Sequence, residues 1–148
     1  MEILNYSVKI KADKEKIWNS MIDSKTYNDW AKAFSKDSQF KGEWIQGNYI
    51  YFIDPNFGGT KALLENVKPF DHIKAKHVAI IGTDGQEDTK SDMAKKWIGA
   101  LESYQLKNDN GTTELFIEIK THEEFVKMFN DCWPKALQLL KEIVEKNT

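Results

Sequence analysis

THEEFVKMFNDCWPKALQLLKEIVEKNT, residues 121–148, is the stretch from which the fold can be predicted. Its apolar side chains recur with the 3.6-residue period of an α-helix and form one face, made of Phe125, Phe129, Cys132, Trp133, Ala136, Leu140 and Ile143. Most of the chain before this stretch has the patterns of β-strands. One long helix facing a sheet predicts a helix that lies in a curved sheet, and such packing can leave a cavity between the two.

Pro134 interrupts the helical pattern and leaves two interpretations open. Proline has no N–H to donate, and its ring crowds the carbonyl of Asn130, so a continuous helix would bend here. Such a bend would bow the helix away from the sheet and make room beside Phe129 and Trp133. Alternatively, residues 122–133 form a separate short helix, and Pro134 occupies the first turn of the next one.

The first part of the chain predicts a strand followed by two short helices. Residues 3–11 alternate between apolar and polar side chains, as a half-buried strand does. Residues 13–23 and 24–34 then show helical spacing of apolar side chains. Asp13 and Ser24 are the residues that we expect to cap these helices, because their side chains can accept a hydrogen bond from the first turn.

Six further strands are predicted between these helices and the last one, in residues 39–44, 49–54, 61–68, 72–81, 101–107 and 113–120. Glycine-containing turns separate several of them, of which NDNG at 108–111 is the strongest signal. The polar residues 82–96 predict a loop that ends in a helical turn. We therefore expect a single α+β domain, residues 1–148, with a curved antiparallel sheet of about six to seven strands.

Composition restricts the partners of this chain. All 21 basic residues are lysine and the net charge is −2. Because arginine is the usual ligand for phosphate and guanine, its absence argues against binding of nucleic acid, although codon bias in an AT-rich genome explains a lysine-only composition equally well. No apolar run reaches the roughly 20 residues that span a bilayer, and the first residues lack the zones of a signal peptide. We expect a cytoplasmic protein without membrane insertion.

Three segments resemble one superfamily of proteins. VKIKADKEKIWNSMIDSKTYNDW at 8–30, LESYQLKNDNGTTELFIEI at 101–119 and CWPKALQLLKEIVE at 132–145 resemble the first strand and helix pair, the last hairpin and the closing helix of the SRPBCC or START/birch-pollen-allergen superfamily. Within it, the chain is most similar to the family of homologues of the activator of heat-shock-protein-90 ATPase. The resemblance extends over essentially the whole chain.

This resemblance implies a helix-grip fold, in which an antiparallel sheet wraps around the C-terminal helix and a hydrophobic cavity lies between them. Members bind lipids, hormones, polyketides or other apolar molecules, and some catalyse cyclisation or hydrolysis. It therefore implies three functions: binding of a small hydrophobic molecule, an enzyme of the polyketide cyclase or hydrolase type, or a stress-response partner of a chaperone. Fold analogy alone does not choose among them.

Aromatic side chains that the fold would direct toward the helix are the candidate ligand-binding residues. With one histidine they are Trp30, Phe34, Tyr51, His77, Trp97, Tyr104, Phe125, Phe129 and Trp133. Tyr49 belongs to the same aromatic set. Such side chains supply apolar area, and tyrosine and tryptophan add a polar tip that can orient a ligand. The alternative is a filled core, since a domain of this size must bury its aromatic residues somewhere.

His77 is the only histidine that the strand pattern places inward, because Lys74 and Lys76 mark the opposite face of residues 72–81. Glu65 and Tyr104 are its expected neighbours. A histidine beside a pocket can act as an acid or base, with Tyr104 or Tyr51 as its electrophilic partner. The alternative role is a hydrogen-bonded core residue.

Other chemistry has weaker support. The three histidines have no metal-ligand spacing with one another or with Cys132, so we expect neither a metal site nor a cofactor. Cys132 is either an apolar packing residue or a nucleophile, and it has no base at helical spacing. The acidic stretch Asp84–Asp92 is a candidate lid over the cavity, anchored by Trp97.

The sequence therefore favours a binding protein over an enzyme, because it contains no complete catalytic constellation. A chaperone partner would need a large apolar or charged surface patch, whereas the predicted surface mixes Lys, Glu and Asp. We expect a monomer or a homodimer.

Overall fold

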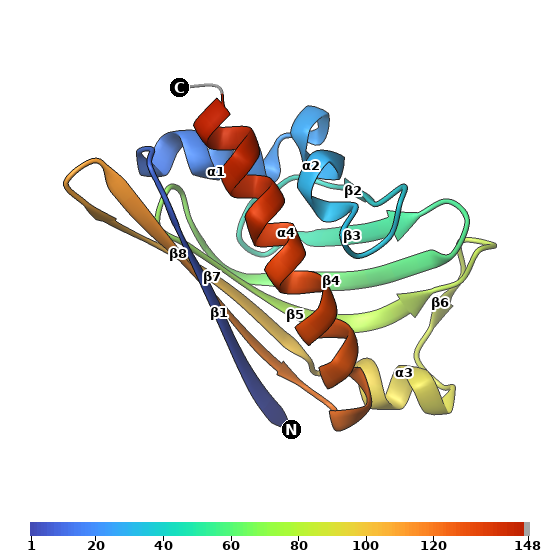
Figure 1. Cartoon of the computed structure of the whole chain (residues 1–148). Coiled ribbons are helices and arrows are strands. Elements are labelled where there is room, and N and C mark those ends of the chain that lie inside the picture. Colours follow the sequence, from blue (N-terminus) through green and yellow to red (C-terminus); the bar gives the residue numbers. More distant parts are fainter. Residues whose placement is uncertain (147–148) are drawn as a thin grey trace.

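The structure of the protein is a computed structural model, and it describes residues 1–146. A curved antiparallel sheet lies behind one long helix, as Figure 1 shows. The elements in chain order are β1 (Glu2–Ile10), α1 (Lys14–Ile22), α2 (Ser24–Ala31), β2 (Gln39–Lys41), β3 (Tyr49–Asp54), β4 (Gly58–Lys68), β5 (His72–Ile81), β6 (Glu87–Asp88), α3 (Asp92–Trp97), β7 (Leu101–Asp109), β8 (Thr112–Thr121), the 3-10 turn η1 (Glu123–Phe125) and α4 (Val126–Lys146).

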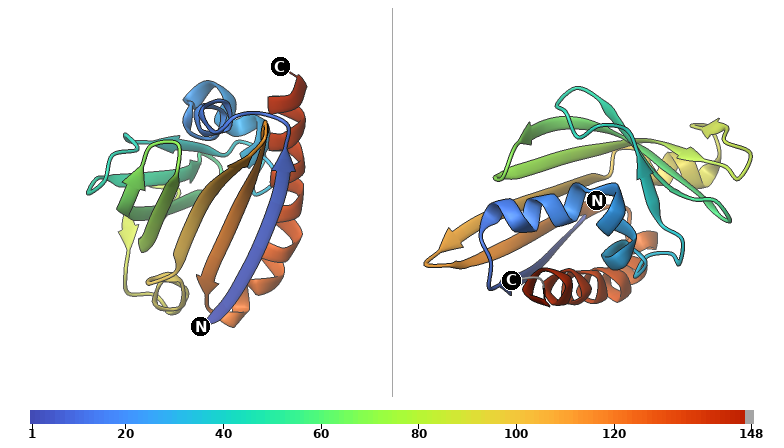
Figure 2. Two further views of the ribbon diagram at one scale, coloured as in Figure 1. Left: turned by 90° about the vertical axis from the view of Figure 1, so that its left-hand side faces the viewer. Right: turned by 90° about the horizontal axis from the view of Figure 1, so that it is seen from above.

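The strand order is β1-β8-β7-β5-β4-β3-β2, and β6 pairs with β5 beside this path. The eighth strand, β6, has only two residues and lies within the predicted polar loop. Helix α4 crosses one face of the sheet, with α1 and α2 at one end of it and α3 at the other (Figure 2). The predicted α+β helix-grip fold is confirmed.

Alternating side chains determine which face of each strand meets α4. In β5 the residues Ile73, Ala75 and His77 are buried, whereas Lys74 and Lys76 are exposed. This confirms the predicted inward face. The hairpin between β7 and β8 turns through Asn110 and Gly111, which have φ values of 52° and 84°. Two successive residues with positive φ are typical of the tight turn that matches the twist of an antiparallel pair.

Aspartates cap both N-terminal helices. The Asp13 carboxylate accepts a hydrogen bond from the Lys16 backbone N–H at 2.9 Å, as expected for the cap of α1. The predicted cap of α2 is wrong by one residue. Asp23, and not Ser24, accepts from the Lys25 N–H at 2.9 Å. Asp23 takes this role because it also ends α1, so no other residue separates the two helices.

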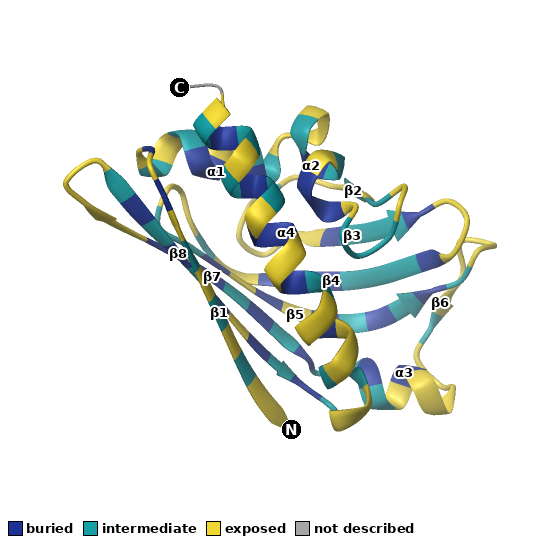
Figure 3. Ribbon diagram, viewed as in Figure 1, coloured by how far each residue is buried: buried dark blue, intermediate teal, exposed yellow. Residues whose placement is uncertain are grey.

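Helix α4 continues through Pro134, so the interpretation of two separate helices is wrong. Pro134 and Asn130 are both exposed. The carbonyl that loses its N–H partner therefore lies on the solvent side, where water can hydrate it. The opposite face carries the buried residues Phe129, Trp133, Ala136, Leu137, Leu140 and Val144, and Figure 3 shows exposed residues along the outer side. The last two residues of the predicted helix, 147 and 148, lie outside the described chain.

Candidate functional site

A cavity of about 430 Å³ lies between the sheet and the first half of α4. Its wall is built by α2, the β3–β4 hairpin, β5, α3, β7 and the start of α4. Eight of the nine predicted ligand-binding residues border it, all except Tyr51. Side chains that are up to about a hundred residues apart along the chain therefore meet at one cavity, as the helical and strand periods predicted.

Trp133 is the centre of the aromatic wall. Its ring is stacked with Trp30 at a centroid distance of 6.1 Å and meets Phe34 edge-on at 5.0 Å. Tyr104 approaches it edge-on at 5.8 Å. Trp133 is only 2% exposed. The rings thus pack against one another as a core does and also border a cavity, so the two interpretations of the aromatic set do not exclude each other.

A second group of rings forms around Trp97, at the end of α3. The Ser91 hydroxyl caps this short helix by accepting from the Ala94 N–H at 3.1 Å. Trp97 is stacked with Phe129 at 5.9 Å and meets Phe125 edge-on at 5.1 Å. Its ring lies 4.6 Å from that of His77. Trp97 thereby connects the histidine to α4.

Three buried polar side chains of the wall, Glu102, His77 and Tyr104, form one cluster. Glu102 accepts a hydrogen bond at each oxygen, from His77 Nε2 at 2.9 Å and from the Tyr104 hydroxyl at 2.7 Å. An ionised carboxylate only accepts, so His77 Nε2 carries the proton in this pair. His77 is 1% exposed and Glu102 9%. Among residues 1–146, His77 Nδ1 has no hydrogen-bond partner.

Hydrogen bonding and charge keep Glu102 ionised. Burial alone would raise the pKa of its carboxyl group, but the charge of His77 and the hydrogen bonds from His77 and Tyr104 lower it below the ordinary value. Burial, followed by the charge of Glu102, raises the pKa of the Tyr104 hydroxyl well above its ordinary value. Tyr104 therefore keeps its proton and acts as a donor.

Glu102 was missed by the sequence analysis, although a signal was present. Glu102, Tyr104 and Leu106 are alternate residues of one strand and therefore share its face. Because Tyr104 and Leu106 point inward, Glu102 must point inward too. The prediction named Glu65 as the neighbour of His77, and this was wrong. Glu65 is exposed and lies 4.0 Å from the ammonium of Lys74 on the outer face.

The prediction that Tyr51 faces the cavity was also wrong. Ile50 and Phe52 occupy the inward side of β3, so Tyr49 and Tyr51 point the other way. The ammonium of Lys61 lies 4.3 Å from the ring centroid of Tyr49 and 5.6 Å from that of Tyr51. These two tyrosines thus form a cation–π group away from the cavity.

The mouth of the cavity is bordered by apolar side chains that are exposed. Phe57, Met93 and Met128 are 75%, 61% and 36% exposed, and all three border the cavity. They come from the β3–β4 turn, α3 and α4. The acidic stretch Asp84–Asp92 does not border it. In the described structure the predicted lid therefore does not contact the cavity. The rim begins at Met93, the residue that follows this stretch.

Asp54 supplies a second carboxylate at this end of the cavity. It is 3% exposed. Its oxygens accept from the Ser35 hydroxyl and from the backbone N–H groups of Asp37 and Asn56, at 3.1 and 2.8 Å for the latter two. The Ser35 hydroxyl first, and then these N–H groups, lower the pKa of Asp54. Asp54 therefore joins the segment that follows α2 to β3 as an anion.

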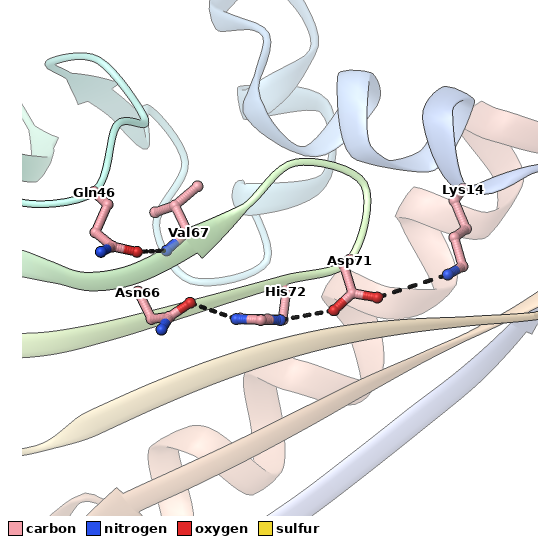
Figure 4. Close-up of polar contacts among 6 residues, drawn as sticks. All are labelled: Lys14, Gln46, Asn66, Val67, Asp71 and His72. Carbon is pink, nitrogen blue, oxygen red and sulfur yellow. Dashed lines mark hydrogen bonds and ion pairs between the residues drawn. The ribbon is translucent and has the colours of Figure 1, made fainter.

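The other two histidines have structural partners outside the cavity. Figure 4 shows His72 between Asp71 and Asn66, with Lys14 of α1 on the far side of Asp71. His72 Nδ1 lies 2.7 Å from the Asp71 carboxylate, which is 3.7 Å from the Lys14 ammonium. This chain of contacts ties the β4–β5 turn to α1. His122 caps η1 by accepting from the Glu124 N–H.

Cys132 is half-buried on α4 and does not border the cavity. Burial and then the charge of Asp131 raise the pKa of its thiol, so the nucleophilic thiolate is disfavoured. This supports a packing role. Within residues 1–146 no three His, Cys, Asp or Glu side chains lie close enough to hold a metal ion. None of the helices in the same range is long and apolar enough to cross a membrane.

The helix held in a curved sheet, with a cavity beneath it, defines a helix-grip domain, and solved structures share this fold. The Aha1 dimer of Colwellia psychrerythraea matches with 23% identity and a TM-score of 0.75, over 98% of this chain and 97% of that one. CalU16 of Micromonospora echinospora matches with 15% identity and a TM-score of 0.70, over 98% and 77% of the two chains. DynU16, a protein of the dynemicin biosynthetic locus, matches with 12% identity and a TM-score of 0.74.

The match to DynU16 includes all of this chain but only 49% of DynU16. These identities are low, so the matches establish the fold and no more. They agree with the helix-grip fold that the predicted resemblance implied. No protein-family model and no curated protein matches the sequence.

Proposed function

We propose that this protein binds a small, mostly apolar molecule in the cavity between the sheet and the first half of α4. The observation that carries this proposal is the composition of the cavity wall. Aromatic rings make up most of its large side chains, and one buried polar cluster of Glu102, His77 and Tyr104 interrupts them. Ligand sites typically have volumes of about 300–1,000 Å³, apolar walls and a few convergent polar groups.

Native mass spectrometry of the purified protein, followed by a thermal-shift screen of lipids, aromatic acids and polyketide-like compounds, tests this function. Ala31 borders the cavity and is 1% exposed. Ala31→Leu fills part of the space and is the matched control. We expect compounds that raise the Tm of the wild type and have little effect on this variant. The proposal fails if no compound stabilises the wild type, or if both proteins respond equally.

Acid–base catalysis is the second candidate, and the unpaired Nδ1 of His77 favours it. Glu102 orients the ring through Nε2, which leaves Nδ1 to accept a proton from a substrate beside Trp97. Tyr104, whose hydroxyl donates to Glu102 in this structure, remains as the candidate electrophilic partner, since Tyr51 lies on the other face. Histidine ring signals in NMR spectra, followed between about pH 5 and 8 with and without a bound compound, test this role. A His77 signal that does not respond to the compound contradicts it.

The oligomeric state is also a proposal. The Colwellia protein is described as a dimer, and we infer a monomer or a homodimer for this chain. Outside the cavity mouth, exposed large apolar residues occur in separate places, such as Ile3 on β1 and Ile45 before β3. Sedimentation velocity at two protein concentrations distinguishes the two states. Because these residues do not form one large patch, a chaperone partner has less support than a small ligand.

A further inference from the structure

The cavity wall is acidic, which is unexpected in a chain with so many lysines. The chain has 21 lysines, yet none of them borders the cavity, whereas Asp54 and Glu102 do. His77 is the only group of the wall that can carry positive charge. The wall therefore has a net charge of −2 with neutral His77 and −1 with protonated His77. Protonation of His77 does not make it positive.

Both carboxylates remain ionised at neutral pH, since the pKa of each is lowered by its hydrogen-bond donors. They are also almost fully buried, at 3% and 9% exposure. Charges in such surroundings are screened little by water and salt. An anionic ligand would meet like charges here without a lysine to offset them, whereas a cation would find compensating charge.

The aromatic rings favour the same kind of ligand. The face of an aromatic ring carries partial negative charge, and tryptophan, tyrosine and phenylalanine faces attract ammonium groups. Three tryptophans border this cavity, Trp30, Trp97 and Trp133, together with several phenylalanine and tyrosine rings. Aromatic walls combined with buried carboxylates are the chemistry that recognises organic cations.

His77 is a further buried polar residue of the cavity wall. It borders the cavity, is 1% exposed, and has no partner for Nδ1 in the described part of the chain. The indole N–H groups of the three tryptophans are likewise without a protein acceptor, and all four of these nitrogen atoms are inaccessible to solvent. Buried polar atoms are normally paired, but inaccessible nitrogens do not identify a ligand, so the ligand class is inferred from the two carboxylates and the aromatic rings.

We propose that the ligand of this cavity is an organic cation, an ammonium group carried on an apolar body about the size of one or two rings. This inference rests on the binding function proposed above and specifies its ligand class. The apolar body lies against the phenylalanine and tryptophan rings, and the ammonium group lies on the side of Glu102 and His77. The cavity volume of about 430 Å³ suits a molecule of this size.

Three probes of nearly equal shape test the proposal on the wild-type protein: benzyltrimethylammonium, its uncharged isostere neopentylbenzene, and the anion phenylacetate. Tryptophan fluorescence measures binding of each. We expect the cation to bind at least about tenfold more tightly than the isostere, and phenylacetate to bind most weakly. Equal or tighter binding of neopentylbenzene overturns the cationic ligand class but leaves the binding function intact. Absence of binding by all three contradicts both.

Glu102→Gln removes the buried charge and keeps a side chain of the same size. We expect the preference for the cation over its isostere to fall at least about threefold in this variant. Asp54→Asn, at the mouth of the cavity, provides a second variant in case the first does not fold. Glu118→Gln on the exposed side of β8 is the matched control and is expected to leave the preference unchanged. An unchanged preference in a folded Glu102 or Asp54 variant overturns the proposal.

Discussion

The two halves of α4 bury the same face of one helix but pack in different ways. In the second half the buried residues are small or aliphatic, Ala136, Leu140 and Val144 among them, and none borders the cavity. Both halves contribute to one core cluster, which also includes Ile10 of β1 and Ile17 of α1. In the first half the buried residues are Phe129 and Trp133, and both border the cavity.

This difference teaches that side-chain shape decides where the helix–sheet layer closes. Aliphatic side chains fill the layer beneath the second half of α4, whereas the aromatic side chains of the first half border a cavity. Polar contacts hold the closed end as well. The Lys141 ammonium donates to the Lys9 carbonyl at 2.7 Å, and the Lys11 N–H donates to the Glu145 carboxylate at 2.9 Å. The closed half therefore anchors α4 while the other half borders the cavity.

The largest expected effect comes from truncation in the closed half. Leu140 is 1% exposed, so Leu140→Ala is expected to lower the free energy of unfolding by about 2–5 kcal/mol. Phe125 is only half-buried at the cavity wall, so Phe125→Ala should cost less, about 1–2 kcal/mol, despite its larger side chain. Urea denaturation measures both. A greater loss for Phe125→Ala would show that the first half of α4 is the better packed one.

Replacing an alanine by a larger residue tests whether each half of the layer has free space. Ala136 is fully buried in the closed half, so Ala136→Leu is expected to destabilise the protein by about 1–3 kcal/mol through overpacking. Ala31 is equally buried but borders the cavity. Ala31→Leu can extend into free space and should cost less than about 1 kcal/mol. Equal losses in the two variants, measured by chemical denaturation, would mean that both halves are filled.

The pH dependence of the free energy of unfolding tests whether Glu102, in the cavity half, is ionised. The pKa of Glu102 is lower in the folded protein than its ordinary value of about 4.3 in an unfolded chain. The stabilisation of the folded state by ionised Glu102 is therefore complete above about pH 4.3 and is lost as the pH falls through the pKa of the folded protein. We expect Glu102→Gln to be about 1–3 kcal/mol less stable than the wild type at pH 7, with the gap narrowing in acid.

Other carboxylates with lowered pKa values, Asp54 and Asp71 among them, also destabilise the protein in acid. They act equally in both proteins, so the difference between wild type and variant reports on Glu102. Glu118→Gln serves as the matched control here too. A gap that stays constant from pH 7 down to pH 3 would contradict the ionised Glu102.

Pro134→Ala, at the boundary between the halves, is expected to have a small effect of the opposite sign. Alanine restores an N–H donor and removes the ring that crowds the Asn130 carbonyl, so stability should rise by about 1 kcal/mol. A straighter helix would lie closer to the sheet and reduce the cavity. We therefore expect weaker ligand binding in this variant by calorimetry. Unchanged binding would show that Pro134 does not determine the shape of the cavity.

Much of the fold and of the candidate site could be predicted from the sequence. Strand and helix periods were sufficient for the fold, for the inward position of His77, and for eight of the nine residues that were expected at a cavity. These are local patterns, in which a residue's face follows from its neighbours along the chain. Tyr51 was misplaced because an aromatic residue occupies both faces of β3, so apolar alternation does not indicate its direction there.

Pairing across strands could not be predicted in the same way. His77 binds Glu102 because β5 and β7 are neighbours in the sheet, with Ala75 opposite Glu102. The expected partner Glu65 lies on β4, where the pairing register with β5 shifts twice. Such irregularities depend on tertiary packing and leave no local signal. The volume of the cavity depends on how side chains from several elements pack together, and local sequence patterns contain no information of that kind.

A diffraction experiment on crystals held under xenon tests most directly whether the aromatic half of the layer is open. Xenon binds in apolar cavities that side chains leave empty. We predict a xenon site bordered by Phe34, Phe129 and Trp133, and none beside Leu140. Absence of xenon among the rings, with their side chains repacked into the space, would contradict a ligand cavity in this protein.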